Sequence, residues 1–365
     1  MGKGLKTVVI LLSLTLILRG SAADMIPTSS WIYESVEVLQ AAGYFQNLDK
    51  GNRPWSRFEI SSILIDIDVN DLSANSLKIE LGRLLYEFKS EIEVISSSGE
   101  KDNFRFYVGL SDNYLTNARN YISIRLSGSL NLNRNLSLKY GAYVDQHFMD
   151  DPYYDGYEWR GFQGYQEQMY INWNSSNIDL KFGRDYIKWG YGHTGNLLIS
   201  DNSRPFDQFS LKVRSRYISF QTFVAQLDKM YNANRYLNAA RFEIKPVANL
   251  SVGLGQSSLY GGENQSLDFT MSNPLAFYSF TQDNDRKSMN MMLYADFAWY
   301  FRNKYKLYSE FLVDDFQIDH KVKSDLEPNE LAFLFGIQAV DLFFDTHGWL
   351  EFVQVRNRTY NVPDA

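Results

Sequence analysis

The sequence contains no cysteine, which excludes a disulfide framework, thiolate metal sites and a cysteine nucleophile. Its 4 histidines are scattered, and neither an H-E-x-x-H nor a G-x-S-x-G pattern occurs. Beyond residue 23 no apolar run is long enough to cross a bilayer as a helix, so a membrane form of this chain would need strands. The net charge of −7 leaves no positive excess for binding nucleic acid.

Aromatic residues are abundant instead. They make up 16% of the chain, with 25 Tyr and 25 Phe, although the mean hydropathy is −0.33. Many rings in a chain that is polar on average are typical of a membrane barrel with an apolar belt and a wet interior. At 365 residues the chain is long enough for one large β domain or two ordinary domains.

Residues 1–23 have the pattern of a secretory signal peptide. Lys3 and Lys6 supply the positive start, residues 7–18 form the apolar segment, and residues 21–23 are small, as a cleavage site requires. The apolar segment is too short for a membrane-spanning helix, although an uncleaved anchor stays a lesser alternative. We therefore predict export.

Residues 24–91 show a helical period. A first helix, which ends at Gly43, carries one apolar face made of Ile32, Val36 and Leu39. Ser56 and Glu59 form a capping box at the start of a second helix. A third apolar stripe consists of Leu77, Leu81, Leu84, Leu85 and Phe88. These helices predict a small subdomain on the periplasmic side of the membrane.

From residue 92 to residue 365, apolar and polar residues mostly alternate with a period of two. Apolar and polar side chains alternate over 122–132 and 136–144, with a tight turn at 133–135 between them. The pattern recurs along the chain and predicts roughly fourteen strands. The polar side chains predicted to face an enclosed interior include Arg125, Lys139, Asp179, Lys181, Lys306 and Glu310.

Two features favour a membrane barrel over a soluble sandwich. The runs reach about nine to thirteen residues, whereas soluble strands average about five or six and bilayer-crossing strands about nine to eleven. Short turns also alternate with long polar loops, as in outer-membrane barrels. The long loops are expected at 147–164, 188–208, 228–238, 258–288 and 316–329. The predicted fold class is mainly β: an antiparallel transmembrane β-barrel with a small N-terminal α-helical subdomain.

The chain ends at Pro363-Asp364-Ala365, whereas an outer-membrane barrel usually finishes on a strand with a terminal aromatic residue. We therefore expect the barrel to be incomplete at its C-terminus.

The stretch 183–211 interrupts the alternation with many turn-forming residues and interleaves rings with charges. Its candidate functional residues are Arg184, Trp189, Tyr191, His193, Asp201, Asn202 and Arg204. Long loops on a rigid scaffold often carry function. Such a stretch can equally fold inward and plug the barrel, with its charges neutralising one another. Both interpretations stay open.

The loop 147–164 combines aromatic rings with charged groups. Its candidate carbohydrate-binding residues are Tyr153, Tyr154, Tyr157, Trp159 and Arg160. Rings provide flat faces for sugars, and charged groups bind hydroxyls or uronates. The alternative is an aromatic girdle at the outer membrane interface, which is favoured for the tyrosines nearest the strand ends. Sugar binding is favoured for Trp159 and Arg160.

Several ordered blocks resemble the signature of the Wzi-type capsule-assembly family. They are Gly183-Arg184, Trp189-Gly190, 196–202, Arg204-Pro205-Phe206, Asn273-Pro274, Phe277-Tyr278 and 308–315. The resemblance implies a lectin barrel in the outer membrane of a Gram-negative bacterium. It further implies capsular or exported polysaccharide as the partner, alongside outer-membrane lipid and, as a further candidate, the polysaccharide export machinery.

Two other classes of function stay open. The first is an outer-membrane pore for sugars or other small solutes. The second is an outer-membrane hydrolase acting on glycan or lipid, for which His193 with Ser200 is a candidate serine–histidine pair close in the chain. Acidic residues that flank the outer loops are Asp150, Asp151, Glu158, Asp314 and Asp315. Because no catalytic pattern unites these residues, we predict no enzyme activity, no cofactor and no metal.

Overall fold

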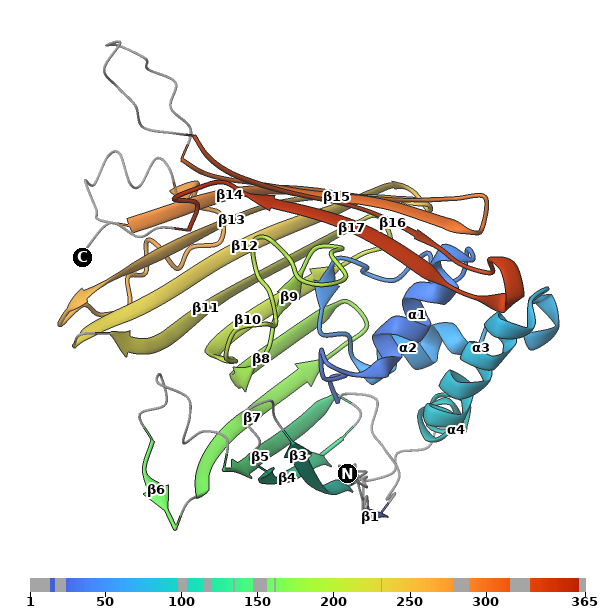
Figure 1. Cartoon of the computed structure of the whole chain (residues 1–365), viewed down its shortest axis with the longest axis horizontal. Helices are drawn as coiled ribbons and strands as arrows, with labels where there is room; N and C mark the ends of the chain where they lie inside the picture. The colour runs from blue at the N-terminus through green and yellow to red at the C-terminus, as the bar shows by residue number, and fades with distance from the viewer. Residues whose placement is uncertain are drawn as a thin grey trace, which may run out of the picture.

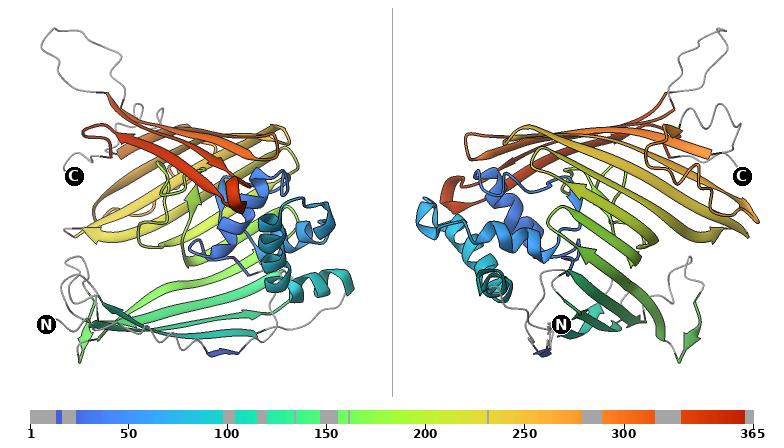
Figure 2. Two further views of the ribbon diagram at one scale, coloured as in Figure 1. Left: turned by 45° about the vertical axis from the view of Figure 1, so that its right-hand side comes forward. Right: turned by 180° about the vertical axis from the view of Figure 1, so that it is seen from behind.

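The computed structural model describes residues 14–16, 24–97, 104–114, 120–133, 135–146, 156–160, 162–230, 232–278, 289–315 and 329–360. Most of these residues form one antiparallel sheet, which curves around the N-terminal segment (Figure 1). The helices gather at one end of the curved sheet, as the two further views confirm (Figure 2).

Thirteen long strands make up the wall of the sheet. They are β3 (Phe104–Tyr114), β4 (Asn120–Asn131), β5 (Leu136–Asp145), β7 (Phe162–Asn174), β8 (Ile178–Asp185), β10 (Phe206–Arg214), β11 (Ile218–Met230), β12 (Ala233–Val247), β13 (Leu250–Glu263), β14 (Met289–Phe301), β15 (Tyr305–Asp315), β16 (Glu330–Ala339) and β17 (Gly348–Val355). Each pairs with the next in this order, and among the described residues β17 does not pair with β3.

Four shorter strands complete the described β structure. β1 (Leu14–Leu16) pairs with β3, and β6 (Glu158–Trp159) pairs with β7. β2 (Asn52–Arg53) and β9 (Lys188–Trp189) form a separate two-stranded sheet. β1 lies inside the segment predicted to be a cleaved leader, and that leader stays a prediction.

The two faces of the sheet differ as the alternation predicted. Along β12, Phe242 and Ile244 are exposed on the convex face, whereas Arg241 and Glu243 are fully buried on the concave face. Lys306 and Glu310 of β15 are likewise buried on the concave face. The apolar residues therefore face outward, and the polar ones face the N-terminal segment.

The prediction of a long loop at 228–238 is wrong. β11 and β12 continue through this region as a hairpin in which Met230 pairs with Ala233, and Asn232 takes a positive φ of 68° in the turn. The polar residues that indicated a loop lie on the ends of two long strands. A strand that projects into water carries polar side chains on both faces, so alternation fails there although the strand continues.

The helical region contains α1 (Trp31–Ala41), α2 (Arg57–Leu64), the 3-10 turn η1 (Val69–Asp71), α3 (Asn75–Glu87) and α4 (Lys89–Ser97). The apolar stripes of these helices pack into one core with Trp55. The predicted capping box of Ser56 and Glu59 is confirmed. No helix among the described residues is both long and apolar enough to cross a membrane.

The helical period extends further than predicted. α4 continues to Ser97 rather than ending at residue 91, and Ile92 donates a backbone hydrogen bond to Phe88. The guanidinium of Arg57 lies 2.5 Å from Glu91, which is fully buried. This long-range ion pair anchors the fourth helix together with Ile92, which packs against the helical core.

Candidate functional site

The short-turn end of the concave face is filled by residues 49–53. The Arg241 guanidinium lies 2.7 Å from Asp296 and donates to Asn52 Oδ1 at 2.7 Å. The Lys212 ammonium lies 3.2 Å from Asp49. Burial alone would raise the pKa of Asp49, but Lys212 and Lys245 outweigh it and hold that pKa below its ordinary value. We call the following residues the inner charge network: Asp49, Asn52, Lys212, Arg241, Glu243, Lys245 and Asp296.

The loop between β8 and β10 forms a second layer on the long-loop side of this network. Trp189 and Tyr191 are buried, with exposed fractions of 0% and 1%. Glu310 of β15 accepts hydrogen bonds from the backbone N–H groups of Tyr191, Gly192 and Leu197, each at 2.8 Å. A carboxylate that satisfies several backbone donors in this way fixes the loop inside the curve of the sheet. We call residues 186–205 the plug loop.

Gly190 is required in the plug loop. Its φ of +106° lies in the left-handed region, and a Cβ there would meet the carboxylate of Glu310 and the hydroxyl of Tyr294. The glycine thus permits the close approach of the loop to the wall.

The plug loop also contacts the helices and β17. The backbone N–H of His193 donates to Glu351 at 2.8 Å, and its ring lies 4.1 Å from that of Trp349. His193 Nδ1 lies 3.8 Å from Glu37 of α1. The loop therefore joins the helical region to the last described strand.

A cluster of rings and charges lies on the concave face at the opposite, long-loop end. The rings of Tyr143 and Tyr165 meet edge to face, with centroids 5.5 Å apart. The Arg125 guanidinium lies 5.2 Å from the centroid of Tyr143 and 3.7 Å from Glu167. The Tyr186 hydroxyl donates to Glu167 at 3.4 Å. We call these five residues the outer cluster.

The outer cluster is accessible, unlike the layers beneath it. The side chain of Arg125 is 51% exposed and that of Glu167 is 20% exposed, while the three tyrosines are half-buried. Burial raises the pKa of Tyr186, and the nearby Glu167 raises it further, so its hydroxyl stays protonated and remains a donor. The cluster combines flat apolar faces with a cation, an anion and hydroxyl groups.

The β6–β7 hairpin projects beyond the sheet at the same end, far from the helices (Figure 1). Trp159 pairs with Phe162 and is 63% exposed, and Tyr157 is 88% exposed. The Arg160 guanidinium lies 5.2 Å from the ring centroid of Trp159. An exposed indole with a cation beside it suits a sugar ring that carries a carboxylate.

A groove of about 590 Å³ separates the plug loop from β16 and β17. It is lined by residues 194–200 with Leu334, Val353, Val355 and Tyr360, and Tyr360 closes it by donating to the carbonyl of Leu197 at 2.6 Å. Its polar groups come from the plug loop, chiefly Thr194, Ser200 and Ser203. The groove is a second cavity at the long-loop side of the plug loop.

A family model described as "Capsule assembly protein Wzi" matches residues 96–359 of this sequence. The chain belongs to the Wzi capsule assembly family. The resemblance found in the ordered sequence blocks is thereby confirmed. A search of curated protein sequences gives no match.

Solved structures show what the Wzi fold is. The chain is similar to Wzi of Escherichia coli, an outer membrane protein involved in group 1 capsule assembly and a carbohydrate-binding β-barrel. The identity is 17% and the TM-score 0.64, over 92% of this chain and 73% of that one. This likeness shows the fold and confirms the predicted fold class, mainly β and of the antiparallel barrel type with N-terminal helices, although β17 and β3 do not pair among the described residues.

Two further solved structures match more distantly. Vibrio cholerae OmpT has 8% identity and a TM-score of 0.32, over 70% of this chain and 89% of that one. Pseudomonas aeruginosa OccD3 has 12% identity and a TM-score of 0.30, over 66% of this chain and 67% of that one.

The candidate functional residues of the stretch 183–211 occupy three different places in the structure. Trp189, Tyr191 and His193 lie in the plug, together with Asp201, which is 3.5 Å from Lys188. Arg184 lies on the convex face and holds Asp207 at 2.7 Å. Arg204 and Asn202 lie toward the rim, where Arg204 is 3.5 Å from Asp228 and Asn202 is exposed. The inward fold of the loop is thus the arrangement that the structure shows.

Of the predicted carbohydrate-binding residues, Tyr157, Trp159 and Arg160 lie together on the hairpin, whereas Tyr153 and Tyr154 lie outside the described residues. Sequence reasoning missed Tyr165, Glu167 and Tyr186. Alternation alone does not find the first two, because the register between β5 and β7 shifts at Gly141 and Ala142. The sequence did contain one indication of the outer cluster, because alternation places Tyr143 on the same face as Lys139.

Proposed function

We propose that this protein is an outer-membrane lectin that holds capsular or exported polysaccharide at the cell surface without turning it over. The outer cluster carries this proposal. It presents three half-buried rings with Arg125 and Glu167 at the long-loop end of the barrel, and the exposed Trp159–Arg160 pair lies at the same end. Membership of the Wzi family and the carbohydrate-binding barrel of its relative support the same conclusion.

The chemistry of the cluster favours sugars over other ligands. Rings that stand edge to face leave flat apolar faces for pyranose rings, which have apolar faces of their own. Arg125 can bind a uronate or a hydroxyl with two parallel N–H groups. Glu167 accepts from sugar hydroxyls. A polysaccharide with acidic sugars meets all these groups along one chain.

The orientation follows from the two ends of the sheet. Outer-membrane barrels keep short turns on the periplasmic side and long loops outside. The helices lie at the short-turn end (Figure 1), so they face the periplasm, where a candidate partner is the export machinery. The apolar convex face then meets lipid, and the outer cluster faces the cell exterior.

Two layers argue against an open pore as the main function. Among the described residues, the segment 49–53 and the plug loop fill the concave face between the helices and the outer cluster. The part of the chain that the structure describes offers the hydrolase alternative no arrangement that would activate a nucleophile. His193 packs on Trp349 and near Glu37, and Ser200 lies in the groove beside β17. Binding without turnover fits the geometry best.

The test compares two tryptophan–arginine pairs in the refolded protein. Trp159 with Arg160 lies at the long-loop end, and Trp31 with Arg83, whose guanidinium is 4.5 Å from the ring centroid, lies at the helical end. We expect Trp159→Ala and Arg160→Ala to weaken retention on immobilised acidic polysaccharide. We expect Trp31→Ala and Arg83→Ala to bind as the parent does. Equal binding by all four variants would remove the hairpin from the site.

A further inference from the structure

The segment 264–278, which follows β13, folds back over the convex face of the sheet. Tyr236, Tyr260 and Met289 of three neighbouring strands pack with Met271 and Tyr278 of this segment into one buried cluster. The Tyr260 hydroxyl accepts from the backbone N–H of Asp268 at 3.1 Å, and Gln256 donates to the carbonyl of Ala276 at 2.6 Å. We call residues 264–278 the outer flap.

The alternation of the strands settles which face the outer flap covers. Arg241 reaches Asn52 on the concave side, and a Cβ on Gly255 would meet Leu198 of the plug loop. Phe242 and Gln256 therefore point to the convex side. The β12–β13 and β13–β14 pairings show no shift between these positions and Tyr236 and Tyr260, so those tyrosines share the convex face.

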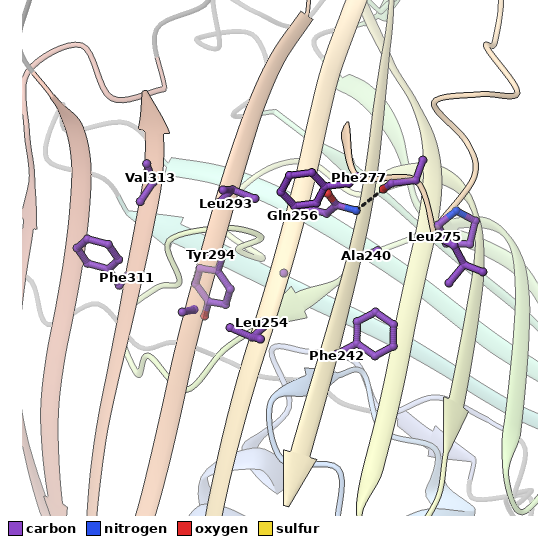
Figure 3. A pocket seen from close by; sticks show the side chains of 14 residues that line it. Ala240, Phe242, Leu254, Gln256, Leu275, Phe277, Leu293, Tyr294, Phe311 and Val313 are labelled. Carbon is purple, nitrogen blue, oxygen red and sulfur yellow. Dashed lines mark hydrogen bonds between the residues drawn. The ribbon is translucent and has the colours of Figure 1, made fainter. Parts of the chain in front are cut away.

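An apolar groove of about 630 Å³ opens between the outer flap and four strands (Figure 3). Its lining includes Phe242, Leu254, Leu293, Phe311 and Val313 of the sheet with residues 274–277 of the flap. The volume falls within the ~300–1,000 Å³ typical of small-molecule sites. Leu275 and Phe277 of the flap are themselves exposed, at 79% and 46%, which continues the apolar convex surface over the flap.

Two buried polar side chains lie on the same face, one row nearer the long-loop end. Asn238 pairs in register with Ser258, two residues along from Ala240 and Gln256. Both are fully buried, and neither side chain has a hydrogen-bond partner among the described residues. A buried amide without a partner costs free energy. The region beneath the flap therefore contains an amide donor, that of Asn238, which has no acceptor among the described residues.

We propose that this groove holds an acyl chain of a membrane lipid. The inference rests on the membrane placement in the proposed function. An apolar groove that opens into a bilayer does not stay empty, because its walls would lose their packing contacts. Water finds few partners on such walls, whereas the surrounding lipid supplies acyl chains. Asn238 lies two residues from Ala240 of the lining, so it is near one end of the groove without being part of its wall.

The test uses a phosphatidylcholine with a photoactivatable diazirine on one acyl chain, incorporated into nanodiscs with the full-length protein. After illumination, cross-linked residues are mapped by mass spectrometry. We expect labelling of the residues that line the groove to exceed, several-fold, labelling of the equally apolar convex face of β16 at Phe335 and Ile337. Leu254→Trp fills the groove and should abolish this excess. Ile244→Trp, a similar change on the same face outside the groove, should leave it unchanged.

The outcomes separate this inference from the proposed function, because polysaccharide retention is measured on the same preparations. Uniform labelling of the convex face, or equal labelling in both tryptophan variants, overturns the lipid groove and leaves the lectin standing. A groove shielded by a second copy of the chain, seen as a dimer by sedimentation, also overturns it. A protein that does not enter nanodiscs overturns the membrane placement and both proposals. If Leu254→Trp does not fold, Ala295→Phe fills the same groove.

Discussion

The inner charge network and the outer cluster contain similar residue types but have different roles. Arg241 and Arg125 both lie on the concave face beside carboxylates, yet Arg241 is fully buried between Asp296 and Asn52, whereas Arg125 is half exposed beside Glu167. A buried charge whose hydrogen bonds are all made inside the protein has nothing left for a ligand. A charge that is half exposed beside rings keeps that capacity. Accessibility, rather than residue type, therefore separates structure from recognition here.

Removal of a buried charge should have the largest effect. Arg241→Leu leaves Asp296 and Glu243 buried without their cation, and we expect it to destabilise the folded barrel by about 3–5 kcal/mol. Urea unfolding of the refolded protein in detergent measures this. Arg83→Leu, which breaks an exposed pair with Glu80 on α3, should cost at most about 1 kcal/mol. Similar losses in both variants would erase the distinction between the buried and the exposed charges.

The plug loop offers an effect of similar size. Glu310→Ala strips a carboxylate from three backbone donors, and each donor left buried and unpaired costs about 1–3 kcal/mol. We expect the plug loop to detach from the wall and to be cleaved by added protease under conditions that leave the parent's loop intact. A variant as resistant to cleavage as the parent would show that the loop does not depend on this carboxylate.

Changes in the outer cluster should alter binding more than they alter stability. The ring of Tyr165 packs on that of Tyr143 at the long-loop end, and an aromatic contact of this kind is worth about 0.5–1.5 kcal/mol. We therefore expect Tyr165→Ala to weaken polysaccharide binding by up to roughly tenfold. Urea unfolding should change far less than for Arg241→Leu. If Tyr165→Ala lost stability but not binding, the outer cluster would be structural, as the inner network is.

The last effect depends on pH rather than on a lost contact. Burial holds the pKa of Lys50 at about 7, below the value of about 10.4 for an exposed lysine. Between these values the unfolded chain binds more protons, so this group makes stability rise with pH by up to about 1.4 kcal/mol per unit. The penalty is full below pH 7 and is lost as pH rises through the unfolded pKa. Lys50→Met should remove this rise in a series of unfolding midpoints, and an unchanged slope would contradict it.

Local patterns predicted the elements that local forces build. The capping box at Ser56 and the buried face of Ile32, Val36 and Leu39 needed only neighbours in sequence. Strand alternation likewise identified the polar face that holds Lys306 and Glu310. These elements follow from spacing alone, so the sequence was sufficient for the fold class.

The features that sequence reasoning could not predict depend on contacts between residues far apart in the chain. The fate of the plug loop depends on Glu310, which lies more than a hundred residues along the chain from Tyr191. The register shift at Gly141 hides Tyr165 and Glu167 from any count of alternating positions. The fold of the outer flap over Tyr236 and Tyr260 leaves no periodic trace. Each depends on tertiary contacts between strands that spacing along the chain does not encode.

The central claim is that the rings and charges at the long-loop end recognise polysaccharide. Its most direct test is a glycan array of capsular and other exported polysaccharides probed with the refolded barrel, with Tyr165→Ala and Arg83→Ala in parallel. We predict that the parent and Arg83→Ala bind the same acidic polysaccharide and that Tyr165→Ala binds it more weakly. No binding by the parent to any polysaccharide, or equal binding by all three proteins, would contradict the account.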